Sequence, residues 1–440
     1  MRVGVIGLGY LGATHAVAMA KLGHEVVGFE RSSDRLEALS AGKLPFFEPG
    51  LESALTQVID SGSLSFAASP KDAELCELYF LCVGTPQADD TGKADTSYVF
   101  AAGLELAAVI SPETVVAGKS TVPVGTAREL QRQMSEACGF EVLLAWNPEF
   151  LREGTAFEDS LKPDRIVVGS ANTSDKRANK VLLSCYESLI TSGVPVIETD
   201  LETAELVKVA ANAFLATKIS FINGMAEVAE ASGADAVMLA KAIGYDERIG
   251  NKFLRTGAGF GGGCLPKDIR GFAARAEELG VGEAVGFLGQ VDQINKRRRQ
   301  RVIDVAHEEL GALPGKKILV LGLAFKPDSD DMRDSPALDI ALGLAKAGAE
   351  VSVHDPVALD ALGERHPELL RARALDAAFR DQELVVLATE WKEYKELDPE
   401  VLGKAVAVKT VIDARNVLDV ESWQRAGWRL IALGRNVHKN

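Results

Sequence analysis

The sequence is poor in the residues that build disulfide frameworks and metal sites. Its 440 residues include five cysteines and six histidines. The number of cysteines is odd, none of them forms a C-x-x-C pair, and no cluster of histidines accompanies them. This usage argues against a disulfide framework and a zinc site and favours a reducing compartment. We therefore expect a cytoplasmic protein that holds no metal.

Positive charge and long apolar runs are also scarce. Lys and Arg number 48 against 63 Asp and Glu, and the net charge of −15 excludes a general attraction to nucleic acid. The one dense basic run, residues 296–301, lies in a predicted helix, and we interpret it as a solvated face. No stretch approaches the roughly 20 consecutive apolar residues that a membrane span needs. We expect neither nucleic acid nor a membrane as a partner.

Short β-rich runs alternate with helical stretches in two parts of the chain. The strand candidates are 3–6, 25–29, 78–83, 114–117 and 165–168, and then 318–321, 350–353, 384–387 and 411–413. Strands separated by helix-length segments are typical of a mostly parallel sheet covered on both faces. Between the two parts the β-signal disappears, and the spacing of apolar residues predicts long helices at 201–232 and 283–310.

This pattern predicts an α/β protein with two Rossmann-like doubly wound domains joined by a long-helix central region. The expected boundaries are 1–198 for the first domain, 199–310 for the central region and 311–440 for the second domain. A helical spacer of this length commonly acts as a dimer scaffold, so we expect a homodimer or a higher homo-oligomer.

A glycine-rich turn in the first domain has the features of a dinucleotide site. The segment Gly7 to Gly12 follows a strand candidate and opens a helix predicted from about Ala13. Its glycines permit a tight turn, a close approach of the pyrophosphate and close packing of helix on strand, while the helix N-terminus attracts the phosphates. Glu30 closes the next strand, where an acid binds the ribose 2′-hydroxyl and repels a 2′-phosphate. The sequence therefore favours NAD over NADP, although Arg31 is an alternative partner for a 2′-phosphate.

The second α/β domain has a different segment at the matching place. Gly322 to Pro327 lacks the glycine series but carries Lys326. A doubly wound sheet still offers a crevice at its strand ends. We predict another phosphorylated ligand there rather than a second dinucleotide.

The most unusual segment runs from Gly257 to Asp268 with the sequence GAGFGGGCLPKD. Glycines crowd onto the N-terminal side of Cys264, and the predicted helix starts at Pro266, a favourable residue in a first turn. A cysteine at a helix N-terminus gains thiolate character from the helix dipole, and Lys267 adds to this effect. We therefore predict that Cys264 is a nucleophile. The other four cysteines, Cys76, Cys82, Cys138 and Cys185, are expected to be inert core residues.

The Cys264 segment resembles the active-site signature GFGGSC-[FL]-PKD of the UDP-glucose/GDP-mannose dehydrogenase family. Eight further blocks of that family occur in order over nearly the whole chain: 7–12, 83–86, 119–126, 147–154, 205–212, 325–327, 331–336 and 413–416. The chain departs from the family pattern at Gly263, where serine is usual, and we expect a slightly looser loop. It departs also at Glu30, where aspartate is commoner, and there we expect only a small shift of the ribose.

The resemblance implies oxidation of the C6 alcohol of a nucleotide sugar to a carboxylate, with two hydrides passing in turn to two NAD molecules. A thiolate adds to the aldehyde, hydride loss gives a thioester, and water cleaves it. The implied substrate is UDP-glucose, and GDP-mannose is the alternative. The segment 246–250, with Phe253 and Gly257 after it, is more similar to the UDP-glucose branch. Two further readings are a non-catalytic NAD-binding regulatory protein and a simple two-electron dehydrogenase, which would not need Cys264.

The resemblance also assigns roles to individual residues. The implied catalytic residues are Cys264 as nucleophile, Lys208 and Asn212 for oxyanions and water, Asp268 for proton transfer and hydrolysis, and Glu149 and Thr121 near the hydrolytic water. The implied NAD contacts are Gly7, Gly9, Tyr10, Leu11, Gly12, Glu30, Arg31, Val83, Thr85, Thr121, Glu153, Lys267 and Arg333. The implied substrate contacts are Glu149, Phe150, Leu151, Arg152, Lys208, Asn212, Arg248, Phe253, Arg255, Gly257, Gly261, Phe325, Lys326 and Arg415. In the family, the residue at Arg248 reaches into the site of a partner subunit.

Overall fold

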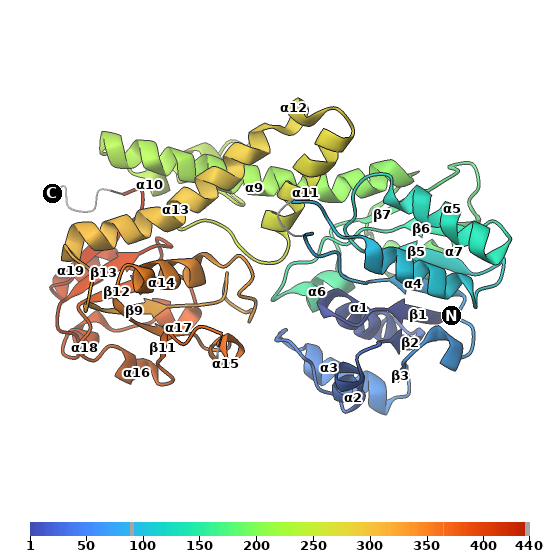
Figure 1. Ribbon diagram of the computed structural model, residues 1–440, viewed down its shortest axis with the longest axis horizontal. Helices are drawn as coiled ribbons and strands as arrows, with labels where there is room; N and C mark the ends of the chain where they lie inside the picture. The colour runs from blue at the N-terminus through green and yellow to red at the C-terminus, as the bar shows by residue number, and fades with distance from the viewer. Residues whose placement is uncertain (89–91, 364, 436–440) are drawn as a thin grey trace. The chain divides into compact units, whose positions relative to one another are not determined.

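The chain builds its two sheets in two compact units of the computed structural model, which describes residues 1–88, 92–363 and 365–435. One unit contains Met1–Ala211 and Arg270–Gly282, and the other contains Asn212–Ile269 and the described residues from Glu283 onward. Figure 1 shows the strands of the first unit in blue to green and those of the second in orange to red. The three-part division expected from the sequence stays a prediction.

The first unit holds an eight-stranded sheet in the order β3-β2-β1-β4-β5-β6-β7-β8. All neighbouring strands are parallel except β6 and β7. The strands are β1 Arg2–Ile6, β2 Glu25–Phe29, β3 Leu64–Ala67, β4 Leu78–Leu81, β5 Val115–Gly118, β6 Leu143–Trp146, β7 Ile166–Ser170 and β8 Val196–Asp200. The sequence predicted β1, β2, β4, β5 and β7, whereas β3, β6 and β8 were missed.

Helices cover both faces of this sheet, as the sequence of β4 requires. Leu78 and Phe80 belong to one buried apolar cluster, and the alternate residues Tyr79 and Leu81 belong to another. Since successive strand side chains point to opposite faces, the sheet is buried on both sides. Its helices are α1 Tyr10–Lys21, α2 Ser33–Ser40, α3 Leu51–Asp60, α4 Ser97–Ala107, α5 Thr126–Cys138, α6 Ala156–Leu161, α7 Arg177–Cys185 and α8 Glu187–Thr191.

The second unit holds a six-stranded, wholly parallel sheet in the order β11-β10-β9-β12-β13-β14. The strands are β9 Lys317–Leu321, β10 Glu350–His354, β11 Leu370–Arg371, β12 Leu384–Leu387, β13 Thr410–Asp413 and β14 Arg429–Ala432. The helices beside it are α14 Pro336–Lys346, α15 Leu359–Leu362, α16 Leu375–Ala378, α17 Lys392–Lys395, α18 Pro399–Leu402 and α19 Val420–Arg425. Both sheets have the doubly wound strand order, so the predicted fold class is confirmed.

Long helices dominate the middle of the chain, as predicted. Helix α9 spans Leu201–Ser232, α10 Ala236–Gly244 and α11 Leu265–Glu278. The single helix predicted over 283–310 is instead two helices, α12 Gly282–Val285 and α13 Phe287–Leu310, with Gly286 between them. Within the described residues, no helix is both long and apolar enough to span a membrane.

The interpretation of residues 296–301 as a solvated face is wrong for its central residues. Arg298 is 0% exposed and Arg299 is 6% exposed, whereas the side chains of Lys296 and Arg297 are more than half exposed. The reason is the helical period: Arg298 and Arg299 lie on the face of α13 that also carries the buried Val302.

Candidate active site

The turn after β1 has the geometry expected of a dinucleotide site. Gly7 has a φ of +85°, a conformation that favours glycine, and α1 begins at Tyr10 rather than near Ala13. A Cβ atom on Gly12 would lie 1.8 Å from the Gly7 carbonyl oxygen, so Gly12 allows the helix to pack on the turn. A Cβ atom on Gly9 would meet nothing within 4 Å. The space that a ligand phosphate requires is therefore open at Gly9.

The acid at the end of β2 makes hydrogen bonds and an ion pair within the protein. Glu30 is 8% exposed, and its carboxylate accepts hydrogen bonds from the backbone N–H groups of Leu8 at 3.1 Å and Ser32 at 3.0 Å. The Arg35 guanidinium lies 3.1 Å from the same carboxylate. Arg31, the alternative partner for a 2′-phosphate, pairs with Glu105 instead. Glu30 is thus fixed beside the glycine turn.

A buried carboxylate that the sequence did not reveal joins this turn to the 147–154 segment. Glu48 is 4% exposed and accepts hydrogen bonds from the Tyr10 hydroxyl and, at 2.7 Å, from the Gly154 N–H. Burial and, next, the bond to Glu48 raise the pKa of Tyr10 above its ordinary value. Tyr10, predicted to contact NAD, is therefore held as a neutral phenol. The predicted contact Glu153 directly precedes Gly154.

Predicted residues at the ends of β4 and β5 lie together. The Thr85 hydroxyl donates to the Thr121 carbonyl oxygen at 2.8 Å, and the Ser120 hydroxyl donates to the Val83 carbonyl oxygen at 2.6 Å. These bonds tie the two strand ends to each other. Three residues predicted around the cofactor, Val83, Thr85 and Thr121, consequently share one edge of the sheet.

Lys208 and Glu149 form a buried ion pair in the first unit. The Lys208 Nζ lies 2.8 Å from the Glu149 Oε1, and the two side chains are 5% and 12% exposed. The second carboxylate oxygen of Glu149 accepts a 2.5 Å hydrogen bond from the Leu151 N–H. Phe150 packs against the Arg165 guanidinium, whose carbon lies 3.6 Å from the ring centre. In such a pair each buried charge compensates the other, and a proton can pass between the amine and the carboxylate.

A second buried cation, Lys119, supports this segment and was not singled out from the sequence. Its ammonium group donates to the Asn147 side-chain oxygen at 3.0 Å and to the Tyr186 hydroxyl at 3.3 Å. Asn147 in turn donates to the Val167 carbonyl oxygen at 2.8 Å. Burial lowers the pKa of Lys119 and raises that of Tyr186. Because Asn147 lies two residues before Glu149, this network fixes the backbone that presents the carboxylate.

The predicted nucleophile stands at the start of α11, in the second unit. Cys264 is exposed and directly precedes Leu265, the first residue of the helix, and its carbonyl oxygen accepts the Asp268 N–H at 2.9 Å. Of the other four cysteines, Cys76, Cys82 and Cys185 are buried as predicted, whereas Cys138 is partly exposed. The local geometry predicted for Cys264 is confirmed.

Asp268 lies one turn beyond Cys264 and is 4% exposed. Its Oδ2 accepts a 2.6 Å hydrogen bond from the Asn212 side chain, and its Oδ1 lies 2.7 Å from the Lys267 Nζ. The structure therefore brings together Asn212, Lys267 and Asp268, three residues predicted separately. This arrangement orients the carboxylate through contacts with both of its oxygens.

The predicted substrate contacts at the strand ends of the second sheet surround one arginine. The Arg415 guanidinium donates to the carbonyl oxygens of Ala388 at 2.6 Å and Gly259 at 2.8 Å, and it lies 3.4 Å from Glu390. It also approaches the Phe325 carbonyl oxygen at 3.4 Å. Burial lowers the pKa of Arg415. Arg415 thus joins the loop before Cys264 to β12.

Other predicted contacts lie on the surface. Arg152 pairs with Asp159, and Arg248 pairs with Asp246 while its side chain stays 89% exposed. Phe253 is 39% exposed and has a φ of +62°, and Arg255 is also exposed. The structure does not bring these residues into the buried groups described above.

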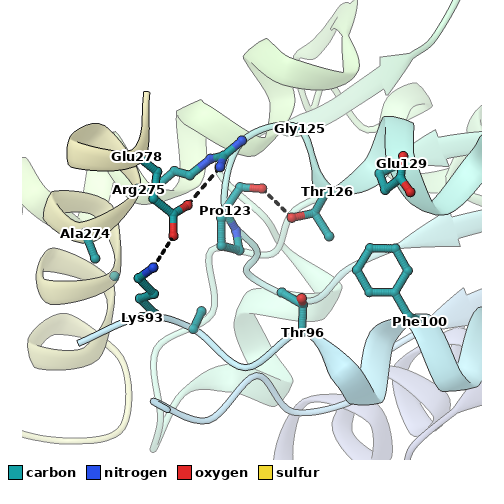
Figure 2. A pocket seen from close by; sticks show the side chains of 12 residues that line it. Lys93, Thr96, Phe100, Pro123, Gly125, Thr126, Glu129, Ala274, Arg275 and Glu278 are labelled. Atoms are coloured by element: carbon teal, nitrogen blue, oxygen red, sulfur yellow. Dashed lines mark hydrogen bonds and ion pairs between the residues drawn. The ribbon is translucent and has the colours of Figure 1, made fainter. Parts of the chain in front are cut away.

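A cavity of about 310 Å³ in the first unit is lined by other residues than those predicted (Figure 2). The Arg275 Nε donates to the Val124 carbonyl oxygen at 3.0 Å, and Lys93 pairs with Glu278 at 2.8 Å. Beside the cavity, the buried Glu205 carboxylate accepts N–H groups at the start of α5, and burial raises its pKa to about 7. These contacts hold residues 124–127, which follow Thr121 in the segment between β5 and α5.

Comparison with known proteins places these features in a family. Three models of the UDP-glucose/GDP-mannose dehydrogenase family match the chain: the NAD binding domain at residues 1–190, the central domain at 202–297 and the UDP binding domain at 319–420. A UDP-glucose 6-dehydrogenase of Rhizobium meliloti (strain 1021) is 39% identical over 99% of this chain and 100% of its own length.

Solved structures give the same result. That of a UDP-glucose dehydrogenase from the hyperthermophilic archaeon Pyrobaculum islandicum is 38% identical, with a TM-score of 0.87 over 100% of this chain and 98% of its own. That of a UDP-D-ManNAc dehydrogenase from Pyrococcus horikoshii is 27% identical, with a TM-score of 0.87 over 99% of each chain.

Two alanine substitutions in the glycine turn should separate packing from cofactor binding. Gly12→Ala forces a methyl group against a backbone oxygen and should destabilise the protein by about 3 kcal/mol or more. Gly9→Ala enters open space, so its melting temperature should stay near that of the unchanged protein while NAD binding weakens by at least roughly tenfold, about 1.4 kcal/mol. Thermal unfolding and NAD titration measure the two effects. Equal loss of stability in both variants would contradict this assignment.

Proposed function

Because the chain belongs to the UDP-glucose/GDP-mannose dehydrogenase family, we propose that it oxidises UDP-glucose to UDP-glucuronate with NAD as the oxidant. The substrate choice rests on identities of 39% and 38% to proteins named as UDP-glucose dehydrogenases, against 27% to one named for UDP-D-ManNAc. The observation that carries the chemistry is Cys264, an exposed thiol at the first turn of α11 with the buried Asp268 one turn away.

The residues of the β1–α1 turn fit a dinucleotide. The open space at Gly9 admits a pyrophosphate against bare backbone, and the start of α1 offers N–H groups to it. Glu30 lies beside that turn and would repel a 2′-phosphate. When bound, NAD supplies a hydride acceptor for each of the two oxidations.

In the first oxidation, Lys208 and Glu149 are proposed to take the proton of the C6 hydroxyl as the hydride leaves. Their 2.8 Å pairing supports this role, because the proton can be shared between an amine and a carboxylate. Thr121 and Glu149 are also proposed to lie near the water of the later hydrolysis. The product of this step is an aldehyde at C6.

The second oxidation is proposed to run through Cys264. Its sulfur bonds to the aldehyde carbon, and the carbonyl oxygen becomes the hydroxyl of a thiohemiacetal. Loss of a hydride and of the hydroxyl proton leaves a thioester. Water then attacks the thioester carbon, the carbon–sulfur bond breaks, and the carboxylate and thiol are released. Asp268, oriented by Asn212 at 2.6 Å, is proposed to accept a proton of that water.

The nucleotide is proposed to bind at the strand ends of the second sheet. The family model for UDP binding covers 319–420, which includes β9 and the segment with Phe325 and Lys326. Lys326 supplies a cation at a crevice position of a doubly wound sheet, where phosphate groups commonly bind. Arg415 adds a second cation close to Phe325.

We also propose a cytoplasmic homodimer that buries the exposed apolar side chains of α9. Phe214, Phe221 and Val228 recur every seven residues and are 65%, 50% and 58% exposed. Such a regular apolar row needs a covering surface.

Multi-angle light scattering at micromolar concentration should give the mass of two chains. Phe221→Asp should lower the measured mass toward that of one chain, because a charge replaces an apolar side chain in the covered row. A single-chain mass for the unchanged protein would reject the dimer.

The substrate proposal is tested by NADH production against a panel of UDP- and GDP-sugars. UDP-glucose should be the best substrate, with two NAD reduced for each UDP-glucuronate formed. A clear preference for GDP-mannose would overturn the substrate and keep the thioester chemistry. NADH formed without any acid would point to a two-electron dehydrogenase instead.

Substitution at the nucleophile tests the thioester. Cys264→Ser should abolish sustained acid formation and leave NAD binding intact, because the serine hydroxyl has a much higher pKa and its anion is scarce at neutral pH. Asp268→Asn should act later and slow hydrolysis, so intact-protein mass spectrometry should detect a covalent adduct after mixing with substrate and NAD. Near-normal turnover by Cys264→Ser would exclude the covalent mechanism.

A further inference from the structure

The loop before Cys264, residues 257–263, consists largely of glycine yet is closely packed. A Cβ atom on Gly259 would lie 2.3 Å from the Asn295 side-chain oxygen, and one on Gly261 would lie 2.4 Å from the Asp334 carbonyl oxygen. A Cβ atom on Gly263 would lie 2.3 Å from the Arg333 guanidinium carbon. The absence of side chains therefore lets neighbouring groups approach the backbone itself.

Helix α13 provides the central contact with this loop. The fully buried Asn295 accepts the Phe260 N–H through its Oδ1 at 2.7 Å and donates from its Nδ2 to the Phe260 carbonyl oxygen at 2.9 Å. Arg299, one turn further along α13, donates to the same carbonyl oxygen at 2.9 Å. Both hydrogen-bonding groups of Phe260 are thereby satisfied by side chains of one helix face.

The ends of the loop are held in the same way. The Asn223 side chain of α9 accepts the Gly257 N–H at 2.9 Å, and the Arg298 guanidinium approaches the Gly257 carbonyl oxygen at 3.4 Å. Near Cys264, the Gly263 N–H donates to the Asp331 carboxylate at 3.2 Å. The glycine at position 263 is therefore anchored through its backbone, and the looser loop expected there remains untested.

The two buried arginines act on the loop through hydrogen bonds rather than through net charge. Arg298 pairs with Glu230 at 3.0 Å, and Arg299 pairs with Asp339. Burying a paired charge contributes little to stability compared with apolar residues of similar volume. The presence of Arg298 and Arg299 in the core is thus better explained by their hydrogen bonds to the backbone of the loop than by a gain in stability.

We infer that Asn295, assisted by Arg299, is a positioning residue for the Cys264 thiol; this inference rests on the function proposed above. Phe260 lies four residues before Cys264, and fixing its peptide limits where the sulfur can lie. Displacement of a reacting group by about 1 Å can lower a rate by roughly 100-fold. The thiol addition step is therefore the step that depends on Asn295.

The chain offers a matched control at the same helix pair. The Ser220 hydroxyl of α9 is fully buried and donates to the Val291 carbonyl oxygen of α13 at 2.8 Å. Ser220→Ala removes a buried hydrogen bond between the same helices without a contact to the loop. Ser220→Ala therefore measures how much stability and activity are lost when only the packing of α9 on α13 is weakened.

The test compares Asn295→Ala, Asn295→Asp and Ser220→Ala in the full-length protein. Both Asn295 variants should lose kcat by at least about tenfold with NAD affinity within about twofold of the unchanged protein. Asn295→Asp keeps the acceptor for the Phe260 N–H but loses the donor, so it cannot restore the rate. Ser220→Ala should keep kcat within about twofold.

The step affected is read from the products. The unchanged enzyme should yield two NADH per acid, whereas a displaced thiol leaves aldehyde that semicarbazide captures, so the Asn295 variants should exceed that ratio. Alkylation of Cys264 by iodoacetamide without substrate should also slow at least about threefold, because the sulfur spends less time at the helix N-terminus. Ser220→Ala should match the unchanged protein in both readouts.

The outcomes separate the two proposals. An unchanged product ratio and an unchanged alkylation rate in Asn295→Ala would overturn the positioning role, even if overall activity fell. Equal effects in Ser220→Ala would overturn it as well, because the loop would then be irrelevant. If the unchanged protein formed no acid, the proposed function would fail, while the alkylation rates would still decide the role of Asn295.

Discussion

Backbone N–H groups in the loops that leave the carboxyl ends of parallel strands need acceptors, because the sheet no longer supplies them. In this chain buried carboxylates meet that need in both units. Glu30, after β2, accepts the Leu8 N–H, and Asp355, after β10, accepts the N–H groups of Leu323 and Ala324 at 2.7 and 3.0 Å. The two acids bind the turn after the first strand of each sheet, β1 in one and β9 in the other. Both turns are therefore stabilised by the same kind of contact.

The same requirement explains several residues whose roles are not apparent in isolation. Glu48 accepts the Gly154 N–H, Glu205 accepts N–H groups at the start of α5, and Asn295 serves both groups of Phe260. A carboxylate that accepts backbone N–H groups resists displacement, because an unpaired buried donor is costly. The loops that carry Thr121, Glu149 and Cys264 are consequently held by buried side chains, without regular secondary structure of their own.

The parts of the structure that were predictable from sequence have local signatures. Alternation of strands and helices, the turn from Gly7 to Gly12, and the helix beginning beside Cys264 all depend on residues close in sequence. Strands β3, β8 and β11 give no clear apolar run, because polar residues interrupt β3 and β8 and β11 has only two residues. Strands β6 and β14 were missed as well, although β6 is a wholly apolar run of four residues.

Contacts between residues far apart in the sequence leave no local pattern and could not be predicted. Glu48 and Gly154 are 106 residues apart, and Lys119 and its hydrogen-bond partner Tyr186 are 67 residues apart. Arg298 and Arg299 were misassigned because a run of charge outweighed the helical spacing from Val291 to Val302, in which positions 295, 298 and 299 fall on the buried face. That spacing was readable, and it would have marked three polar residues as buried.

The crowding around the glycines before Cys264 also bears on how such an enzyme can be diversified. A methyl group at Gly259, Gly261 or Gly262 would meet Asn295, the Asp334 backbone or the Phe325 ring at 2.3–2.9 Å. Random mutagenesis of these positions would yield mostly inactive clones, whatever sugar is selected for. Productive libraries for a new substrate should leave this stretch untouched and vary exposed side chains such as Arg255.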